Sequence, residues 1–184
     1  MTTFIVTVEN KPGVLTRVAS LFRRRAYNIE SLTVGHTETP GLSRMTIVVD
    51  VDAEGAHHVE AHLYKLVNVL RVENVTHKPN VMRELTLIKV ATSPSTRPEI
   101  FQLADVFRAR VIDVSIDSLV LELTGGGAKL DRLLEVLGPY GVLEMARTGT
   151  LAMGRGEGGA FEGPGQGRAA GRTDEPQADI AYSV

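Results

Sequence analysis

Apolar and polar residues alternate with two different periods along the first half of the chain. A period of two predicts strands over 4–8, 27–34, 43–52 and 71–76. Helical spacing predicts a helix along Val14, Val18, Leu21 and Phe22, and a second one along Val59, Leu63, Leu66, Val67 and Leu70. The turn sequences NKPG and ETPG separate these elements. The predicted order of the first half is therefore β-α-β-β-α-β.

The second half repeats that order of elements. We predict strands over 85–91, 110–115, 118–124 and 142–150. The sequence from Thr96 to Glu99 is typical of a capping box with Pro98 at the first helical position. A helical stripe follows at Ile100, Leu103, Ala104 and Phe107, and the last helix has Leu130, Leu133, Leu134 and Leu137, with Gly138 and Pro139 ending it.

Two units of this kind predict an α+β fold, with two ferredoxin-like βαββαβ domains in tandem. The domains are expected at 1–77 and 84–153, joined by a linker at 78–83 where Pro79 and Asn80 interrupt the pattern. Residues 154–184 contain no Leu and many irregularly spaced Gly and Pro residues, which predicts a flexible Gly-rich tail. In each domain the helices cover one face of the sheet, and the other face or its edges need a partner.

Composition narrows the function classes. Residues 1–77 hold eight Lys or Arg and eight Asp or Glu, and residues 78–153 hold nine of each, so the net charge of −2 comes from the tail. Neutral domains with 5% aromatic residues are not typical of nucleic-acid binders. The chain has no Cys, no G-x-S-x-G motif and no Walker motif, so no catalytic constellation is predicted.

No apolar run reaches the roughly 18 residues of a membrane helix, and the start MTTFIVTVENK is unlike a signal peptide. We therefore expect a cytoplasmic protein that does not enter a membrane.

Two polar clusters allow more than one interpretation. His58 and His62 are four residues apart on a predicted helix, opposite its apolar stripe, so they are expected in solvent, with a metal pair as the alternative. The run 23–25 of three Arg residues ends a helix, where cations favour the negative end of the dipole. A surface for a partner or a phosphate is the alternative for these arginines.

The NKPG loop offers a site for a small anion. It joins a strand to a helix, so backbone N–H groups at Gly13, Val14 and Leu15 are expected to point outward. Gly13 has no Cβ and lets a ligand approach, and Asn10 supplies an amide donor and an acceptor. Composition alone favours an ordinary turn at this place.

Longer runs change that balance. VENKPGVLTRVASLFRRRAYNIESLTV, followed by LSRMTIVVD and LYKLVNVLRV, resembles the regulatory (small) subunit of acetohydroxyacid synthase, also called acetolactate synthase. The resemblance is strong over 1–77, which is similar to an amino-acid-sensing ACT domain, and looser through RELTLIKVA, FRARVIDVS and MARTGTLAMGRG.

The resemblance implies a non-catalytic subunit that binds valine or another branched-chain amino acid and confers feedback inhibition. It implies a homodimer of ACT domains paired through edge strands, with the effector at their interface. The implied contacts are Asn10, Gly13, Val14 and Leu15 of one chain, with Asn28 and Ile29 of the partner chain. The implied large catalytic subunit carries thiamine diphosphate, Mg²⁺ and FAD, whereas no cofactor or metal is expected in this chain. The second domain is expected to activate that subunit.

These contacts suit a zwitterion, because helix-start N–H groups bind a carboxylate and Asn or strand carbonyl groups accept from an ammonium group. Val14, Leu15 and Ile29 are expected to form the walls around the side chain, whose burial contributes about 1.5–3 kcal/mol. Ala26 departs from the family, which commonly has Gly before the Tyr of YNIESL. An ACT-type transcription regulator is the alternative function, but no helix-turn-helix or basic arm is predicted, and a free-standing metabolic enzyme is the third.

Overall fold

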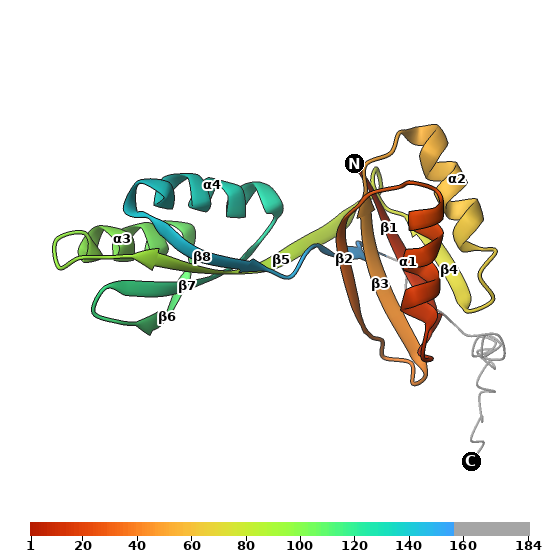
Figure 1. Cartoon of the computed structure of the whole chain (residues 1–184), viewed down its shortest axis with the longest axis horizontal. Helices are drawn as coiled ribbons and strands as arrows, with labels where there is room; N and C mark the ends of the chain where they lie inside the picture. The colour runs from red at the N-terminus through yellow and green to blue at the C-terminus, as the bar shows by residue number, and fades with distance from the viewer. Residues whose placement is uncertain (157–184) are drawn as a thin grey trace, which may run out of the picture.

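The computed structural model describes residues 1–156, and the predicted tail lies outside the described residues from 157 onward. The first domain contains β1 (Thr2–Glu9), α1 (Val14–Arg24), β2 (Ile29–His36), β3 (Leu42–Val49), α2 (Ala53–Leu63) and β4 (Val69–Asn74). Its antiparallel sheet has the strand order β2-β3-β1-β4. Both helices cover one face of this sheet (Figure 1). The core between these layers includes Phe4, Val6, Val18, Phe22 and Ile47.

The second domain contains β5 (Asn80–Ala91), α3 (Arg97–Phe107), β6 (Arg110–Val114), β7 (Ser118–Gly125), α4 (Gly127–Leu137), a 3₁₀ turn (Gly138–Tyr140) and β8 (Val142–Arg147). A further strand, β9 (Leu151–Gly154), follows. The antiparallel sheet β6-β7-β5-β8 carries α3 and α4 on one face. Its core includes Ile88, Leu121, Leu130 and Leu133. The predicted α+β fold with two ferredoxin-like units is confirmed.

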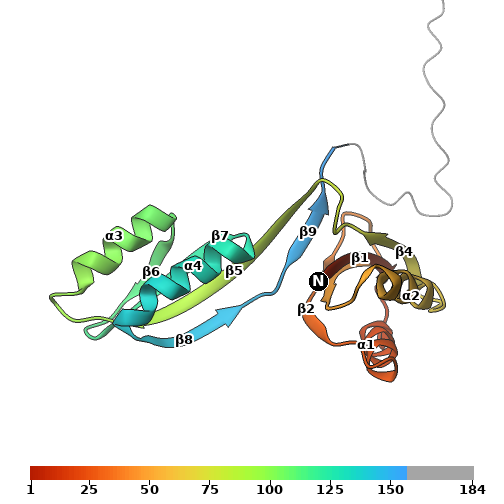
Figure 2. The same cartoon turned by 90° about the horizontal axis from the view of Figure 1, so that it is seen from above.

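One strand belongs to both halves of the molecule. The segment 78–83, expected as a linker, contains the first four residues of β5, and these pair with β9 from Asn80–Gly154 to Arg83–Leu151. From Glu84 onward β5 pairs instead with β7 and, from Thr86, with β8. Figure 2 shows β5 and β9 running side by side towards the first domain. The tail boundary shifts accordingly, because Gly154 is the last residue of β9.

The β5–β9 ribbon covers the face of the first sheet that the helices leave open. Ala152 is fully buried with Ile5, Val75 and Met82. Its N–H donates to Thr46 Oγ1 at 3.2 Å, and Arg44 Nη2 donates to its carbonyl at 3.2 Å. Thr46 is therefore fully buried, although it lies on the face of the sheet away from the helices. The partner that this open face requires is a segment of the same chain.

The second predicted helix is shorter than its apolar stripe. α2 ends at Leu63, so Leu66 and Val67 lie in the following turn, and Val67 is 89% exposed. After the end of α2 the chain turns and buries Asn68. The Asn68 carbonyl accepts from the N–H of Glu9 at 2.9 Å, and its side chain accepts from Arg17 at 2.7 Å. These bonds outweigh the local preference for another helical turn.

The predicted capping box is also wrong, and α3 begins at Arg97, so Pro98 is its second residue rather than its first. Thr96 caps α3 with no side-chain hydrogen bond, and the Glu99 carboxylate accepts instead from Tyr140 Oη at 2.9 Å. The reciprocal pair lies one turn earlier. Ser93 Oγ accepts from the N–H of Thr96 at 3.2 Å, and Thr96 Oγ1 accepts from the N–H of Ser93 at 2.9 Å. These reciprocal hydrogen bonds stabilise the turn that precedes α3, not the first turn of α3 itself.

The departure at Ala26 has a clear backbone basis. α1 ends in a Schellman motif, in which the N–H of Tyr27 donates to the carbonyl of Phe22 at 3.1 Å. The aromatic rings of these two residues meet edge to face at 6.4 Å. Ala26 supplies the left-handed residue of the motif with φ +57°, a conformation that glycine adopts without strain.

Candidate functional site

The start of α1 is an open backbone turn. The N–H of Asn10 donates to the carbonyl of Gly41 at 2.7 Å, which fixes the end of β1 against the β2–β3 hairpin. Gly13 then caps α1 with φ +82° and no side-chain hydrogen bond. A Cβ built on Gly13 would meet nothing within 4 Å. The first turn of the helix therefore faces free space.

The expected donors and walls at this turn are only partly available. The N–H of Val14 donates to the carbonyl of Lys11 at 3.3 Å, so it is engaged within the turn. The N–H groups of Gly13 and Leu15 donate to no acceptor among the described residues. Val14 is 5% exposed and packs into the core, whereas Leu15 is 44% exposed. The Leu15 side chain is therefore open to solvent beside the turn, and Val14 supports the turn from beneath.

Asn28 and Ile29 lie at the other end of the same sheet. Ile29 pairs with Val49, which pairs with Thr2 at the start of β1, whereas His36 pairs with Ser43 beside Val8. The seven residue steps from the beginning to the end of β2 span about 23 Å. One chain therefore does not bring Asn28 and Ile29 to Asn10 and Gly13.

His36 lies beside Asn10 at the start of α1, and the sequence analysis did not predict this neighbour. Asn10 Nδ2 lies 3.4 Å from His36 Nδ1. His36 at the end of β2 therefore holds the Asn10 side chain beside the turn that begins α1. At the opposite end, the amide of Asn28 donates to Glu30. No motif in the sequence marks His36 as a neighbour of Asn10, because 25 residues of other elements separate the two.

A short polar network fixes the start of the α1 turn. Asn68 donates to Glu9, and Lys11 Nζ lies 3.0 Å from the Glu9 carboxylate. These two hydrogen bonds, the one from Asn68 above all, lower the pKa of Glu9. The carboxylate stays charged and orients the loop that carries Asn10 and Gly13.

The same strand β2 connects the site to the second domain. Ser31 Oγ accepts from the N–H of Thr150 at 2.7 Å, and Thr33 Oγ1 donates to the carbonyl of Thr150 at 3.0 Å. Thr150 Oγ1 in turn donates to Glu84 at 2.7 Å. The loop between β8 and β9 is thus bound directly to β2, the strand that begins at Ile29.

Glu84 marks the point where β5 passes from one sheet to the other. Arg147 Nη2 lies 2.7 Å from Glu84 Oε2, and Arg147 Nη1 lies 2.9 Å from Asp131 Oδ1. Burial lowers the pKa of Arg147, but the hydrogen bonds to Glu84 and Asp131 outweigh it and raise the pKa overall. A hollow of about 540 Å³ opens beside this junction, lined by β2, β5 and β9 among others.

His58 and His62 were expected in solvent, with a metal pair as the alternative interpretation. The rings of His58 and His62 lie 6.5 Å apart, and residues 1–156 contain no group of three or more His, Cys, Asp or Glu placed to hold a metal. His58 is exposed as expected, but His62 is half-buried. Desolvation, followed by the charges of Arg25 and Lys65, lowers the pKa of His62. Among residues 1–156, no helix combines the length and apolarity of a membrane span.

Profiles of known protein families match both halves of the chain. A family profile for the ACT domain of AHAS small-subunit-like proteins matches residues 4–71, and one for the small subunit of acetolactate synthase matches residues 83–156. The acetolactate synthase small subunit of Bacillus subtilis is 51% identical over 152 residues, covering 82% of this chain and 88% of the relative. That of Mycolicibacterium smegmatis is 48% identical over 154 residues, covering 84% and 91%.

A solved structure agrees with these sequences. The crystal structure of the acetolactate synthase small subunit from Thermotoga maritima superposes with a TM-score of 0.78 at 43% identity, covering 84% of this chain and 96% of that one.

Proposed function

Because this chain belongs to the family of acetolactate synthase small subunits, we propose that it is a non-catalytic regulatory subunit that senses a branched-chain amino acid, valine first, at a seam between two copies. The chain binds a large catalytic subunit, raises its activity and confers feedback inhibition. The thiamine diphosphate, Mg²⁺ and FAD of the reaction belong to that partner, in the cytoplasm. The family supports the partnership, and the site geometry supports the sensing.

The observation that carries the proposal is the outer edge of β2, which pairs with no other strand of residues 1–156. β2 is an outer strand of its sheet, with β3 on its inner side. A two-fold axis beside β2 pairs it antiparallel with the β2 of a second copy, so the beginning of one strand meets the end of the other. Asn28 and Ile29 of the second copy then approach Asn10 and Gly13. The opposite edge, β4, cannot bring these residues together, because β1 and β3 lie between β4 and β2.

The chemistry of each half suits one end of the ligand. The open N–H groups of Gly13 and Leu15, at the positive end of α1, bind the carboxylate. The Asn10 and Asn28 side chains accept from the ammonium group, and Leu15 and Ile29 contact the aliphatic side chain. A ligand held by two chains stabilises their association, so sensing and dimerisation are linked.

Calorimetry of the full chain with valine, leucine and isoleucine tests the proposal, with Gly13→Asp and Gly13→Asn as a matched pair. Asp and Asn both tolerate the left-handed backbone and have the same shape, so only the charge differs. A carboxylate about 5 Å from that of the ligand costs about 3 kcal/mol at an effective dielectric of 20, more than a hundredfold in affinity. We expect Gly13→Asp to abolish valine binding and Gly13→Asn to retain much of it. Wild-type affinity in Gly13→Asp would refute the site.

A mixing experiment tests the seam itself. Asn10→Ala and Asn28→Ala each remove one side of every site, so each variant alone is expected to bind no valine. In a mixed dimer one site carries both substitutions and the other carries neither. Random mixing should therefore restore about a quarter of the wild-type sites. No recovery on mixing, although mixed dimers form, would place both asparagines in the same chain's site or in none.

A further inference from the structure

Five cationic side chains gather on the helical layer of the first domain. Residues 1–77 contain eight Lys or Arg residues and eight Asp or Glu residues. Five of the eight cations lie along α1 and the turn after α2, and all five are exposed. We call this region the α1 basic surface: Arg17, Arg23, Arg24, Arg25 and Lys65. A domain with no net charge therefore carries a strongly positive face.

The carboxylates of the described chain do not neutralise this face. Each ion pair in residues 1–156 involves other cations, such as Arg147 with Glu84 or Arg71 with Glu73. Arg17 donates to Asn68, and Arg24 donates to the Ser20 carbonyl. Both acceptors are neutral, so these bonds orient the side chains without neutralising their positive charge. The helix dipole favours cations in the last turn, but it does not account for Arg17 in the second turn or Lys65 on a separate segment.

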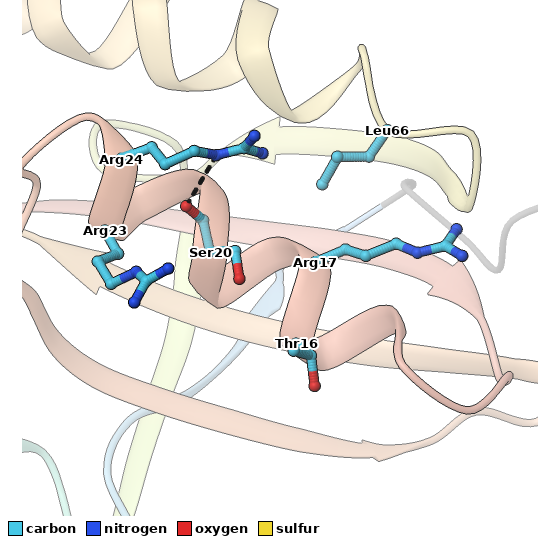
Figure 3. Close-up of a pocket in the computed structure, with 6 residues that line it drawn as sticks. All are labelled: Thr16, Arg17, Ser20, Arg23, Arg24 and Leu66. Carbon is cyan, nitrogen blue, oxygen red and sulfur yellow. Dashed lines mark hydrogen bonds between the residues drawn. The ribbon is translucent and has the colours of Figure 1, made fainter.

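The α1 basic surface is also hollowed. Figure 3 shows Arg17, Ser20 and Arg24 along α1, with Leu66 from the turn after α2 beside them, lining a hollow of about 440 Å³. A second hollow of about 420 Å³ shares Arg24 and Leu66 and also includes His62 and Lys65. The Nδ1 atom of His62 is buried without a hydrogen-bond partner in the described residues. Apolar carbon and a row of guanidinium groups are thus presented together.

We propose that the α1 basic surface docks an acidic patch of the large catalytic subunit. The inference rests on the proposed function, which supplies that partner. The eight residue steps from Arg17 to Arg25 extend about 12 Å along the helix, so the charges form a row rather than a cradle for one phosphate group. Arginine is enriched at protein interfaces relative to the rest of the protein surface. The surface lies beyond the first turn of α1 and off the β2 edge, so docking and sensing use different residues.

Charge reversal in the full chain tests the proposal, with Lys65→Glu and Lys78→Glu as a matched pair. Both residues are exposed lysines in turns of the first half, and both variants change the net charge equally. Binding to the purified large subunit is measured at low and high ionic strength. We expect Lys65→Glu and Arg24→Glu each to weaken binding about tenfold, and Lys78→Glu to change it less than twofold. The wild-type affinity should fall with salt, and that of a Lys65→Glu, Arg24→Glu double variant should fall less.

Valine calorimetry on the same variants separates docking from sensing. Unchanged valine binding together with weakened docking supports the proposal. Docking of Lys65→Glu and Arg24→Glu equal to that of Lys78→Glu overturns it while the proposed function stands. Loss of valine binding in these variants would assign the residues to the effector site and also overturn it. If the wild-type chain binds no large subunit, the proposed function itself fails. If the wild-type chain binds inorganic polyphosphate more tightly than the large subunit, the surface is a phosphate site and the proposal is overturned.

Discussion

Replacing Gly149 by alanine places a methyl group where the two halves of the molecule are in contact. Gly149 has φ +81°, and a Cβ built on it lies 2.6 Å from Ser31 Oγ, well inside contact distance. Ser31 Oγ cannot rotate away freely, because it accepts from the N–H of Thr150 at 2.7 Å. The substitution therefore forces either the loop or this hydrogen bond to give way.

Two terms set the magnitude. The left-handed backbone costs an alanine about 1 kcal/mol. Loss of the Ser31–Thr150 hydrogen bond, with a half-buried N–H left unpaired, costs about 1–3 kcal/mol more. Gly41 isolates the first term, because it has the same φ of +81° and nothing within 4 Å of its Cβ position. We expect Gly149→Ala to lower the free energy of unfolding by about 1–3 kcal/mol more than Gly41→Ala does.

Urea titration at a fixed chain concentration measures both variants. A double-mutant cycle with Ser31→Ala adds a direct check, since it removes the Oγ atom that clashes. In that background the cost of Gly149→Ala should fall to that of Gly41→Ala. Equal costs for Gly149→Ala and Gly41→Ala in the wild-type background would show that the loop between β8 and β9 is not held against β2, and would refute the contact.

Two further predictions concern the first domain. Ala26→Gly relieves the left-handed backbone at the end of α1 and should raise the free energy of unfolding by about 0.5–1 kcal/mol, with an unchanged value in urea titration counting against the Schellman assignment. The pKa of Glu9 is lowered from 4.5 by its bonds to Asn68 and Lys11, so its contribution to stability is complete above pH 4.5 and is lost as the pH falls through the folded pKa. Acid titration of Glu9→Gln should show a flatter loss of stability below pH 4.5 than the wild type, and identical profiles would contradict the network.

The order of elements was predictable because each core-facing residue repeats with a clear period. The alternation of Met45, Ile47 and Val49 gave β3 and its buried face, and the spacing of Val14, Val18 and Leu21 gave α1. Periodicity failed where tertiary contacts decide. Leu66 and Val67 continue the stripe of α2, but the helix stops because the turn must bury the polar groups of the residue that follows.

β9 shows why alternation alone can place the wrong side chains inside. In this strand Leu151 and Met153 are 55% and 62% exposed, whereas Ala152 is fully buried. The strand approaches the first sheet closely enough for its backbone to bond Thr46 Oγ1, and only a small side chain fits that gap. The local geometry of the candidate site was predictable only in part. The turn at Gly13 follows from local sequence, but the neighbour His36 and the burial of Val14 depend on how the sheet is assembled.

The sharing of β5 between two sheets bears on how this protein can be dissected. A fragment ending at residue 77 would keep its strands and helices but lose the ribbon that seals Ile5 and Val75, leaving apolar carbon in water. A fragment beginning at residue 84 would lose the part of β5 that pairs with β9. Neither half is whole without the other, so genetic truncation or proteolysis at this boundary yields two incomplete pieces rather than two complete domains.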